Sequence, residues 1–306
     1  MKYFRNTTDI VISQPTAITL GKFDGLHTGH QYLFECLYER KKDGLKTVVF
    51  TFDKPPRDEI EHCEHDVLST TEEKAYLFER SGVDYFVEFP FNKEVMEMEA
   101  EDFIAFLVEK LFMKAVVVGN DFRFGHNRRG DYRMLQEYGK RYGYETRVVN
   151  KKQYNNEDIS SSLIRKEITA GNIELANELL GYSYFVKGEV RYGNQIGRTI
   201  GFPTINLIPQ KEKKLPPFGV YAVEVEIGDE CYKGIANVGV KPTIDKPSEA
   251  GAETHIFGFD GDLYGKMVKV SFLHWIRPEQ KFANIEELKE QINKDMTEVL
   301  EYFGLE

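Results

Sequence analysis

The chain has 306 residues, of which 41% are hydrophobic and 29% are charged, and its formal net charge is −10. This length suits about two domains of ~150 residues each, and the balance excludes a disordered or fibrous chain. Nucleic-acid binding depends on clustered Lys and Arg, so the negative charge argues against a nucleic acid as partner. No apolar run approaches the ~18 residues of a membrane span, and we expect no membrane partner.

The three cysteines, Cys36, Cys63 and Cys231, show no CxxC spacing, and the first residues contain no apolar signal segment. An odd number without such spacing does not predict a disulfide framework, so we expect a reducing, cytoplasmic location. Residues 61–65, Glu-His-Cys-Glu-His, include metal-ligand side chains. Because metal ligands usually come from separated elements, we interpret this stretch as a surface loop.

Apolar runs alternate with helical patterns over the first 180 residues. Strands are predicted over residues 16–20, 47–52, 85–89, 115–118 and 146–149, and helices over 31–42, 72–80, 100–112, 131–142 and 173–180. The alternation predicts a doubly wound parallel α/β domain, with helices on both faces of one sheet. In such folds, ligands bind beyond the carboxyl ends of the strands.

The alternation of predicted strands and helices ends after about residue 183. Strands without intervening helices are predicted over residues 184–190, 204–207, 221–227, 232–238, 253–259 and 267–275. This series predicts a six-stranded antiparallel barrel, closed by a terminal helix that Asn284 caps together with Glu287. We therefore predict two domains, residues 1–182 and 183–306. The buried stripe of the terminal helix is predicted to be Ile285, Leu288, Ile292, Val299 and Phe303.

A segment rich in glycine and histidine, residues 21–30 (Gly-Lys-Phe-Asp-Gly-Leu-His-Thr-Gly-His), joins the first strand to the first helix. Its glycines allow close approach of a ligand, and free amides at a helix start bind anions. His27 and His30 can donate hydrogen bonds to a phosphate there. A zinc site is the weaker interpretation because no third ligand is placed by spacing, and no P-loop motif is present. The predicted phosphate site also includes Gly21, Phe23, Gly25 and Gly29.

Two more segments lie at the predicted ligand edge. Residues 119–125, Gly-Asn-Asp-Phe-Arg-Phe-Gly, supply an acid and aromatic faces for a flat ligand; the alternative is a surface loop before Asp131, which caps the next helix. Residues 159–165, Ile-Ser-Ser-Ser-Leu-Ile-Arg, place hydroxyls and amides at a helix start, with an arginine one turn later. With the histidines, this second segment predicts a two-sided clamp for a triphosphate.

A glycine-rich segment, residues 193–201, precedes Phe202-Pro203-Thr204-Ile205-Asn206 in the second half. Strand alternation puts Thr204 and Asn206 on one face, where their oxygen atoms suit a Mg²⁺ ion that also binds phosphates. Glu253 is a candidate base. The alternative is a polar barrel face on which Glu253 is only a charge at the start of a strand.

These motifs resemble those of the bacterial bifunctional riboflavin kinase/FAD synthetase (flavokinase/FMN adenylyltransferase) family along nearly the whole chain. The first half is similar to the nucleotidyltransferase half of that family through residues 21–30, 119–125 and 159–165. The second half is similar to the kinase half through residues 197–207, 216–221, 237–243, 262–265 and 281–282.

The resemblance implies a relay in which the C-terminal domain converts riboflavin and ATP to FMN and ADP. The N-terminal domain then converts FMN and a second ATP to FAD and pyrophosphate. Riboflavin, FMN and ATP are the implied partners, Mg²⁺ accompanies ATP, and the flavins are substrates and products. The oligomeric state stays open.

The resemblance also implies roles for single residues. In the kinase half, Glu253 would be the base and Thr204 and Asn206 would be Mg²⁺–ATP ligands, while Gly197 and Arg198 belong to the loop over the phosphates. In the other half, His27 and His30 would steady the attacked phosphate. The remaining expected contacts are Ser161, Ser162 and Arg165 with pyrophosphate, and Asp121, Phe122 and Phe124 with flavin or nucleotide.

Three positions depart from the family pattern. Relatives usually carry Pro-His-Pro where this chain has Lys54-Pro55-Pro56, Lys241 replaces an arginine, and Gly258 replaces an acidic residue. An arginine-to-lysine change loses a two-pronged hydrogen-bond donor but keeps the charge. None of these changes removes a residue with an implied chemical role, so we expect both activities. The alternatives are a kinase with a silent first half and a flavin-binding module without turnover.

Overall fold

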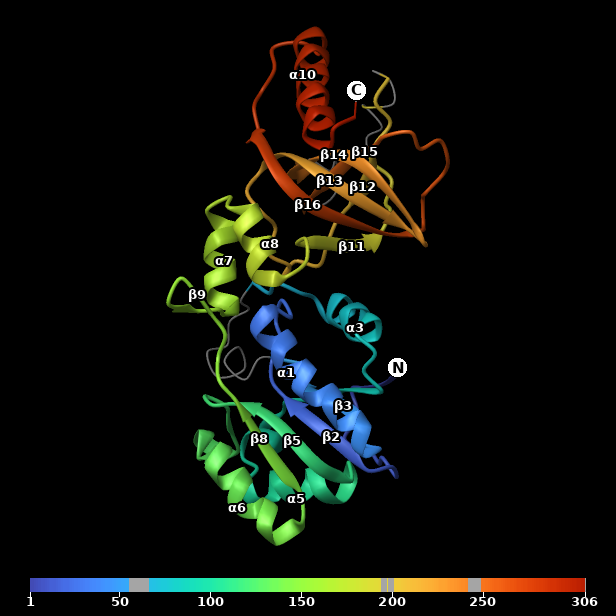
Figure 1. Ribbon diagram of the computed structural model, residues 1–306. Helices are drawn as coiled ribbons and strands as arrows, with labels where there is room; N and C mark the ends of the chain where they lie inside the picture. Colours follow the sequence, from blue (N-terminus) through green and yellow to red (C-terminus); the bar gives the residue numbers. More distant parts are fainter. Residues whose placement is uncertain (55–65, 194–196, 198–200, 242–248, 306) are drawn as a thin grey trace. The chain divides into compact units, whose positions relative to one another are not determined.

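The computed structural model describes residues 1–54, 66–193, 197, 201–241 and 249–305. The chain forms two compact units, Met1–Ser161 and Ser162–Glu306 (Figure 1). The predicted domain boundary between residues 182 and 183 stays a prediction. Within the described ranges, no helix combines the length and apolar character that crossing a membrane requires.

The first unit contains a six-stranded sheet in the order β1-β4-β3-β2-β5-β8, and every neighbouring pair is parallel. The strands are β1 (Lys2–Arg5), β2 (Thr16–Leu20), β3 (Lys46–Phe52), β4 (Tyr85–Phe89), β5 (Met113–Gly119) and β8 (Glu145–Val149). Sequence patterns predicted all but β1, an edge strand in which no residue is fully buried and whose four residues form no apolar run. Two hairpins lie outside the sheet: β6 (Arg123–Phe124) with β7 (Gly130–Asp131), and β9 (Gln153–Tyr154) with β10 (Glu157–Asp158).

Helices cover both faces of this sheet, which confirms the doubly wound prediction. On one face, α1 (Thr28–Glu39) and α3 (Thr71–Arg80) share a buried cluster with the sheet. On the other face, α5 (Ala100–Lys110) and α6 (Tyr132–Tyr142) do the same. The single turn α4 (Lys93–Met96) and the 3₁₀ turns η1 (Arg40–Asp43) and η2 (His126–Arg128) complete the unit. All five residues of β2 are buried, as expected for a central strand with both faces covered.

Helix α1 begins three residues earlier than predicted. His27 adopts the extended backbone of an N-cap residue, with φ −64° and ψ 170°, so the helix starts at Thr28, directly after it. The His27 side chain makes no capping hydrogen bond to α1. The start of a helix is a typical position for binding an anion.

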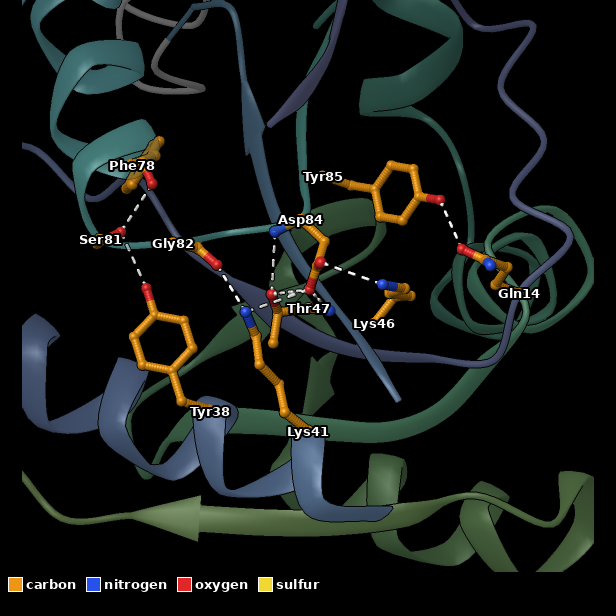
Figure 2. Close-up of polar contacts among 10 residues, drawn as sticks. All are labelled: Gln14, Tyr38, Lys41, Lys46, Thr47, Phe78, Ser81, Gly82, Asp84 and Tyr85. Atoms are coloured by element: carbon orange, nitrogen blue, oxygen red, sulfur yellow. Dashed lines mark hydrogen bonds and ion pairs between the residues drawn. The ribbon is translucent and has the colours of Figure 1, made fainter. Parts of the chain in front are cut away.

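The amino end of the sheet is fastened by Asp84, which directly precedes β4 (Figure 2). Its Oδ2 accepts hydrogen bonds from the backbone amide of Thr47 at 2.9 Å and from the Thr47 hydroxyl at 2.8 Å. Lys41 and Lys46 place their ammonium groups 3.4 Å and 3.5 Å from the same carboxylate. Burial opposes ionisation of Asp84, but the Thr47 hydrogen bonds and the two lysines outweigh it and lower the pKa of the carboxyl group. Asp84 thereby joins β3, β4 and the turn after α1.

The second unit combines α7 (Ser161–Thr169) and α8 (Ile173–Leu180) with a nearly closed antiparallel barrel (Figure 1). The barrel order is β11-β16-β13-β14-β15-β12. A bridge between Arg191 and Asn206 links the two ends of this order. The strands are β11 (Phe185–Glu189), β12 (Ile205–Leu207), β13 (Gly219–Ile227), β14 (Glu230–Lys241), β15 (Glu249–Ile256) and β16 (Met267–Pro278). The predicted six-stranded barrel is confirmed.

The terminal helix α10 (Ile285–Phe303) covers the outer face of the barrel, where Val299 packs on Val220, Ala222 and Ile235. Asn284 caps it as predicted, by accepting a hydrogen bond from the Glu287 amide. The predicted stripe was wrong at Ile285, which is 54% exposed. Asp295 lies buried instead, because it holds Arg277 of β16 in a two-pronged ion pair at 2.8 Å and 2.7 Å.

Candidate functional site

The loop between β2 and α1 brings His27 and His30 together. Their rings stack with centroids 3.7 Å apart. Phe23, 1% exposed, meets the ring of His30 edge-on at 5.3 Å, so its side chain belongs to the core and supports the histidine. A Cβ on Gly29 would lie 3.1 Å from Nδ1 of His27, and one on Gly21 would lie 2.9 Å from the Phe23 ring. The glycines of the motif thus make room for its own aromatic side chains as well as for a ligand.

Both imidazoles are neutral near neutral pH. Burial, assisted by the charge of Lys151, lowers the pKa of His27 to about 4. Burial also lowers the pKa of His30 well below its usual value, with a smaller effect from His27. Nδ1 of each ring is buried and has no hydrogen-bond partner among the described residues. Buried polar atoms are nearly always paired, so two such atoms on neighbouring rings make this loop a candidate ligand site.

The start of the predicted serine segment meets the same loop. The Ser161 hydroxyl donates to the backbone oxygen of Asp24 at 2.8 Å. The carbonyl oxygen of Ile159 would lie 3.8 Å from a Cβ on Gly29. Two of the predicted motifs therefore meet in the first unit. The hydroxyl proton of Ser161 is used in a hydrogen bond to the backbone. Ser162 and Arg165 lie on α7 in the second unit.

An aromatic pocket of about 540 Å³ opens at the carboxyl ends of β2, β3 and β5. Of the predicted residues, Gly21, Asp121, Phe122 and Phe124 line it. The Phe122 and Phe124 rings stack at 5.6 Å. Further apolar residues that the motifs did not single out also line it, among them Phe52, Phe91, Met98 and Phe103. They come from separate elements, so only the fold reveals that they share a pocket. Its walls suit a flat aromatic ligand.

In the second unit, the predicted kinase residues converge on neighbouring strands. Thr204, directly before β12, donates from its hydroxyl to Oε1 of Glu253 at 2.7 Å. Asn206 on β12 pairs directly with Glu253 on β15, and Asn237 on β14 pairs with Glu253 from the other side. Directly paired residues project from the same face, so these side chains form one polar row. Asn237 was not predicted as a site residue, because only strand register places it there.

Two described glycines of the glycine-rich segment, Gly193 and Gly197, lie against this row. A Cβ on Gly193 would lie 2.4 Å from Nδ2 of Asn206, and one on Gly197 would lie 3.3 Å from Oγ1 of Thr204. Arg198 lies outside the described residues, as does the acidic stretch 61–65. Within the described part of the chain, no three His, Cys, Asp or Glu side chains converge as a metal site.

The fold and the two sites define a class: an α/β nucleotidyltransferase unit joined to a small barrel with a phosphotransferase-like polar centre. Comparison with family models agrees with this division. Residues 9–163 match the FAD synthetase model and residues 180–303 match the riboflavin kinase model.

Curated relatives carry the name bifunctional riboflavin kinase/FMN adenylyltransferase. The protein of Buchnera aphidicola from Acyrthosiphon pisum is 36% identical, covering 100% of this chain and 99% of its own. That of Escherichia coli K12 is 37% identical, covering 94% and 93%, respectively. A solved structure described as a macrolide-efflux protein from Streptococcus pneumoniae is 33% identical, with a TM-score of 0.83 over 96% of this chain and 97% of that one.

This chain belongs to the family of bifunctional riboflavin kinase/FMN adenylyltransferases. The predicted family, the enzyme class and the assignment of the two activities to the two halves are confirmed. The roles of the individual site residues stay predictions.

Proposed function

We propose that this chain converts riboflavin to FMN in its barrel and FMN to FAD in its α/β unit, through the residues described above. The observation that carries the proposal is that each unit gathers its own reactive side chains. Thr204, Asn206 and Glu253 share one face of the barrel. His27 and His30 stack, with unpaired nitrogens, at the start of α1.

In the barrel, the Glu253 carboxylate would accept the proton of the terminal ribityl hydroxyl as that oxygen attacks the γ-phosphate of ATP. The Thr204 hydroxyl orients this carboxylate through its 2.7 Å hydrogen bond. The oxygens of Thr204 and Asn206 would hold Mg²⁺, since hard oxygen donors and few protein ligands suit that ion. Mg²⁺ would neutralise charge on the phosphates. The chain itself supplies the remaining part of catalysis, which is positioning.

In the α/β unit, the FMN phosphate would attack the α-phosphate of ATP, with pyrophosphate leaving and no covalent enzyme intermediate. The flavin ring would lie in the aromatic pocket, against Phe122 and Phe124. Each neutral imidazole can give one N–H to a phosphate oxygen that becomes more negative in the transition state. The contacts of Ser162 and Arg165 with pyrophosphate stay predictions from their motif, whose first serine, Ser161, donates to the backbone oxygen of Asp24.

Relatives usually carry a histidine in the segment where this chain has Lys54-Pro55-Pro56, and its absence is compatible with an active transferase. Asp53 Oδ1 accepts hydrogen bonds from the backbone amides of Lys54 at 2.7 Å and Phe91 at 2.8 Å. These bonds fix the chain directly after β3, beside the pocket wall, without a histidine. The two free cysteines among the described residues, Cys36 and Cys231, support the proposed cytoplasmic location. The proposal includes neither a nucleic acid nor a membrane as partner.

The test is a product assay. Purified protein is incubated with Mg²⁺–ATP and either riboflavin or FMN, and the flavins are separated by chromatography. We expect riboflavin to give FMN and then FAD, and added FMN to give FAD. Glu253→Gln should lower the kinase rate about 10²-fold or more, the usual effect of losing a general base, and leave FAD formation from FMN intact.

A matched control is Glu230→Gln at the exposed start of β14, away from the polar row, which should leave both steps unchanged. FMN as the end product, with added FMN inert, would mean that the α/β unit is silent. No turnover of either flavin would favour a binding module. A kinase rate that Glu253→Gln leaves unchanged would remove Glu253 from the mechanism.

A further inference from the structure

None of the motifs includes Lys151, the lysine whose positive charge contributes to the lowered pKa of His27. Lys151 follows β8, the strand next to β5 at the carboxyl edge of the sheet. Its ammonium group lies 2.9 Å from Oδ2 of Asp121 and 3.6 Å from Oδ2 of Asp158. Asp121 lines the aromatic pocket, and Asp158 ends the hairpin strand β10, just before the serine segment. Lys151 thus pairs with one residue of the aromatic pocket and with one residue directly before the serine segment.

Two carboxylates keep this ammonium group in place. Asp158 is itself held by Gln153, whose amide donates to its Oδ1 at 2.9 Å, and the Ile159 amide donates to the backbone oxygen of Lys152 at 3.0 Å. The hydrogen bond to Asp121 raises the pKa of Lys151, so the side chain is charged at neutral pH. The geometry of the hairpin therefore sets where a full positive charge lies.

The adenylyl-transfer site needs such a charge. The histidine pair carries none near neutral pH, because burial keeps both rings neutral. ATP and FMN bring several negative charges, and phosphoryl-type transfer is stabilised mainly by cations and oriented donors around the phosphates. The field of Lys151 reaches His27, where it contributes to the lowered pKa.

The two ion pairs of Lys151 are weak enough to be exchanged. The side chains of Lys151, Asp121 and Asp158 are 38%, 62% and 44% exposed. Exposed pairs of this kind contribute little to stability, whereas a hydrogen bond between an ammonium group and a phosphate is charge-assisted. An ammonium group has three N–H donors, so it can bind a phosphate oxygen and keep one of its carboxylates.

We infer that Lys151 is a phosphate-binding residue of the FMN adenylyltransferase site, positioned by Asp121 and Asp158 and contacting a phosphate of the bound nucleotide. The inference rests on the proposed function of the α/β unit. It adds to that site a cation that comes from the β8–β9 connection and lies outside all three motifs.

The test compares Lys151→Met, which removes the charge at similar length, with Lys151→Arg, which keeps it. We expect Lys151→Met to lower kcat/KM for FMN adenylylation about 10- to 100-fold, the range for losing one hydrogen bond to a charged group. Lys151→Arg should recover most of this loss. Phosphorylation of riboflavin by the same preparations should stay unchanged, which shows that the protein is folded.

Two measurements distinguish phosphate binding by Lys151 from a role in which Lys151 only holds the hairpin in place. By NMR, the pKa of His27 should rise in Lys151→Met, and by calorimetry the affinity for Mg²⁺–pyrophosphate should fall by a similar factor. Asp158→Asn removes one of the two carboxylates that position Lys151 but keeps the cation, so it should lower the affinity for pyrophosphate less than Lys151→Met does. A purely structural tie would make the two variants equally harmful.

Unchanged adenylylation in Lys151→Met, or a loss that Lys151→Arg does not restore, would overturn the inference. If the wild-type protein forms no FAD, the proposed function fails by itself. Pyrophosphate binding then still decides the role of Lys151: weaker binding to Lys151→Met supports it, and equal binding refutes it.

Discussion

At the amino end of the six-stranded sheet, the Asp84 carboxylate is paired with Thr47, Lys41 and Lys46 (Figure 2). At the carboxyl end of the same sheet, two stacked histidines leave Nδ1 of each ring without a hydrogen-bond partner among the described residues. Both ends contain partly or fully buried polar groups. The Asp84 carboxylate is satisfied from within the protein, whereas the two histidine nitrogens have no partner among the described residues.

The difference between these groups indicates that the carboxyl end of the sheet serves ligand binding and that Asp84 at the amino end serves stability. A buried polar atom without a partner costs free energy, so a fold keeps one mainly where a ligand completes it. Fully paired groups such as Asp84 contribute to stability instead. Changes at the carboxyl end should therefore lower activity, and changes at the amino end should lower stability.

The largest effect is expected from removing a histidine. His30→Ala takes away an N–H that would stabilise the phosphate in the transition state, and loss of one such donor typically costs about 10²- to 10³-fold in rate. FAD formation from FMN should fall by that factor, while riboflavin phosphorylation by the same preparation stays unchanged. A change of less than about threefold in FAD formation would contradict the comparison, because it is only ~0.7 kcal/mol in barrier.

The next effect concerns pH. In the folded protein the pKa of His27 is about 4, against 6.5 for the free side chain. Between these values the unfolded chain binds more protons, so stability should fall as pH is lowered from about 6.5 to about 4, by roughly 3 kcal/mol from this residue. Urea unfolding across this range, compared between wild type and His27→Gln, isolates the contribution. Parallel stability–pH curves for the two proteins would disprove it.

A smaller effect is expected at the amino end. Asp84→Asn removes the charge that accepts from Thr47 and pairs with Lys41 and Lys46, and hydrogen bonds to a charged group contribute ~2 kcal/mol. Urea unfolding should show a loss of about this size, with FAD formation unchanged at 25 °C. Asp43→Asn is the control, because Asp43 is 58% exposed and holds a single ion pair with Arg40, so it should cost little. A loss of activity without a loss of stability in Asp84→Asn would break the comparison.

Much of the fold could be predicted from sequence patterns because its buried strands and helices have clear periodicities. The strand Tyr85–Phe89 and the helix Ile173–Leu180 match their predicted bounds. The wrong or missing predictions concern single elements and residues. β1 depends on pairing with β4 across more than 80 residues, which no short pattern encodes. Ile285 fits the pattern of a buried stripe, but the buried residues of α10 are Val299 and Asp295. Asp295 is buried with its partner Arg277, which comes from β16.

The candidate sites divide in the same way. The histidines, the serines and Thr204 with Asn206 lie in short, distinctive motifs, so their residue types could be identified from the chain alone. Asn237 joins Glu253 through strand register, and Lys151 meets Asp121 because they follow the neighbouring strands β8 and β5. Contacts of this kind depend on tertiary structure, which local sequence does not carry.

The register of β15 determines how the kinase half responds to insertions and deletions in this strand. Glu253 faces the polar row only because strand side chains alternate, and its neighbour Thr254 is fully buried on the other face. Insertion of one residue between Gly251 and Glu253 would leave composition and hydrophobic content almost unaltered, yet it would turn the carboxylate toward the interior. Insertion of two residues would restore its face. The kinase half is therefore vulnerable to an odd-numbered insertion or deletion that a scan of single substitutions would never sample.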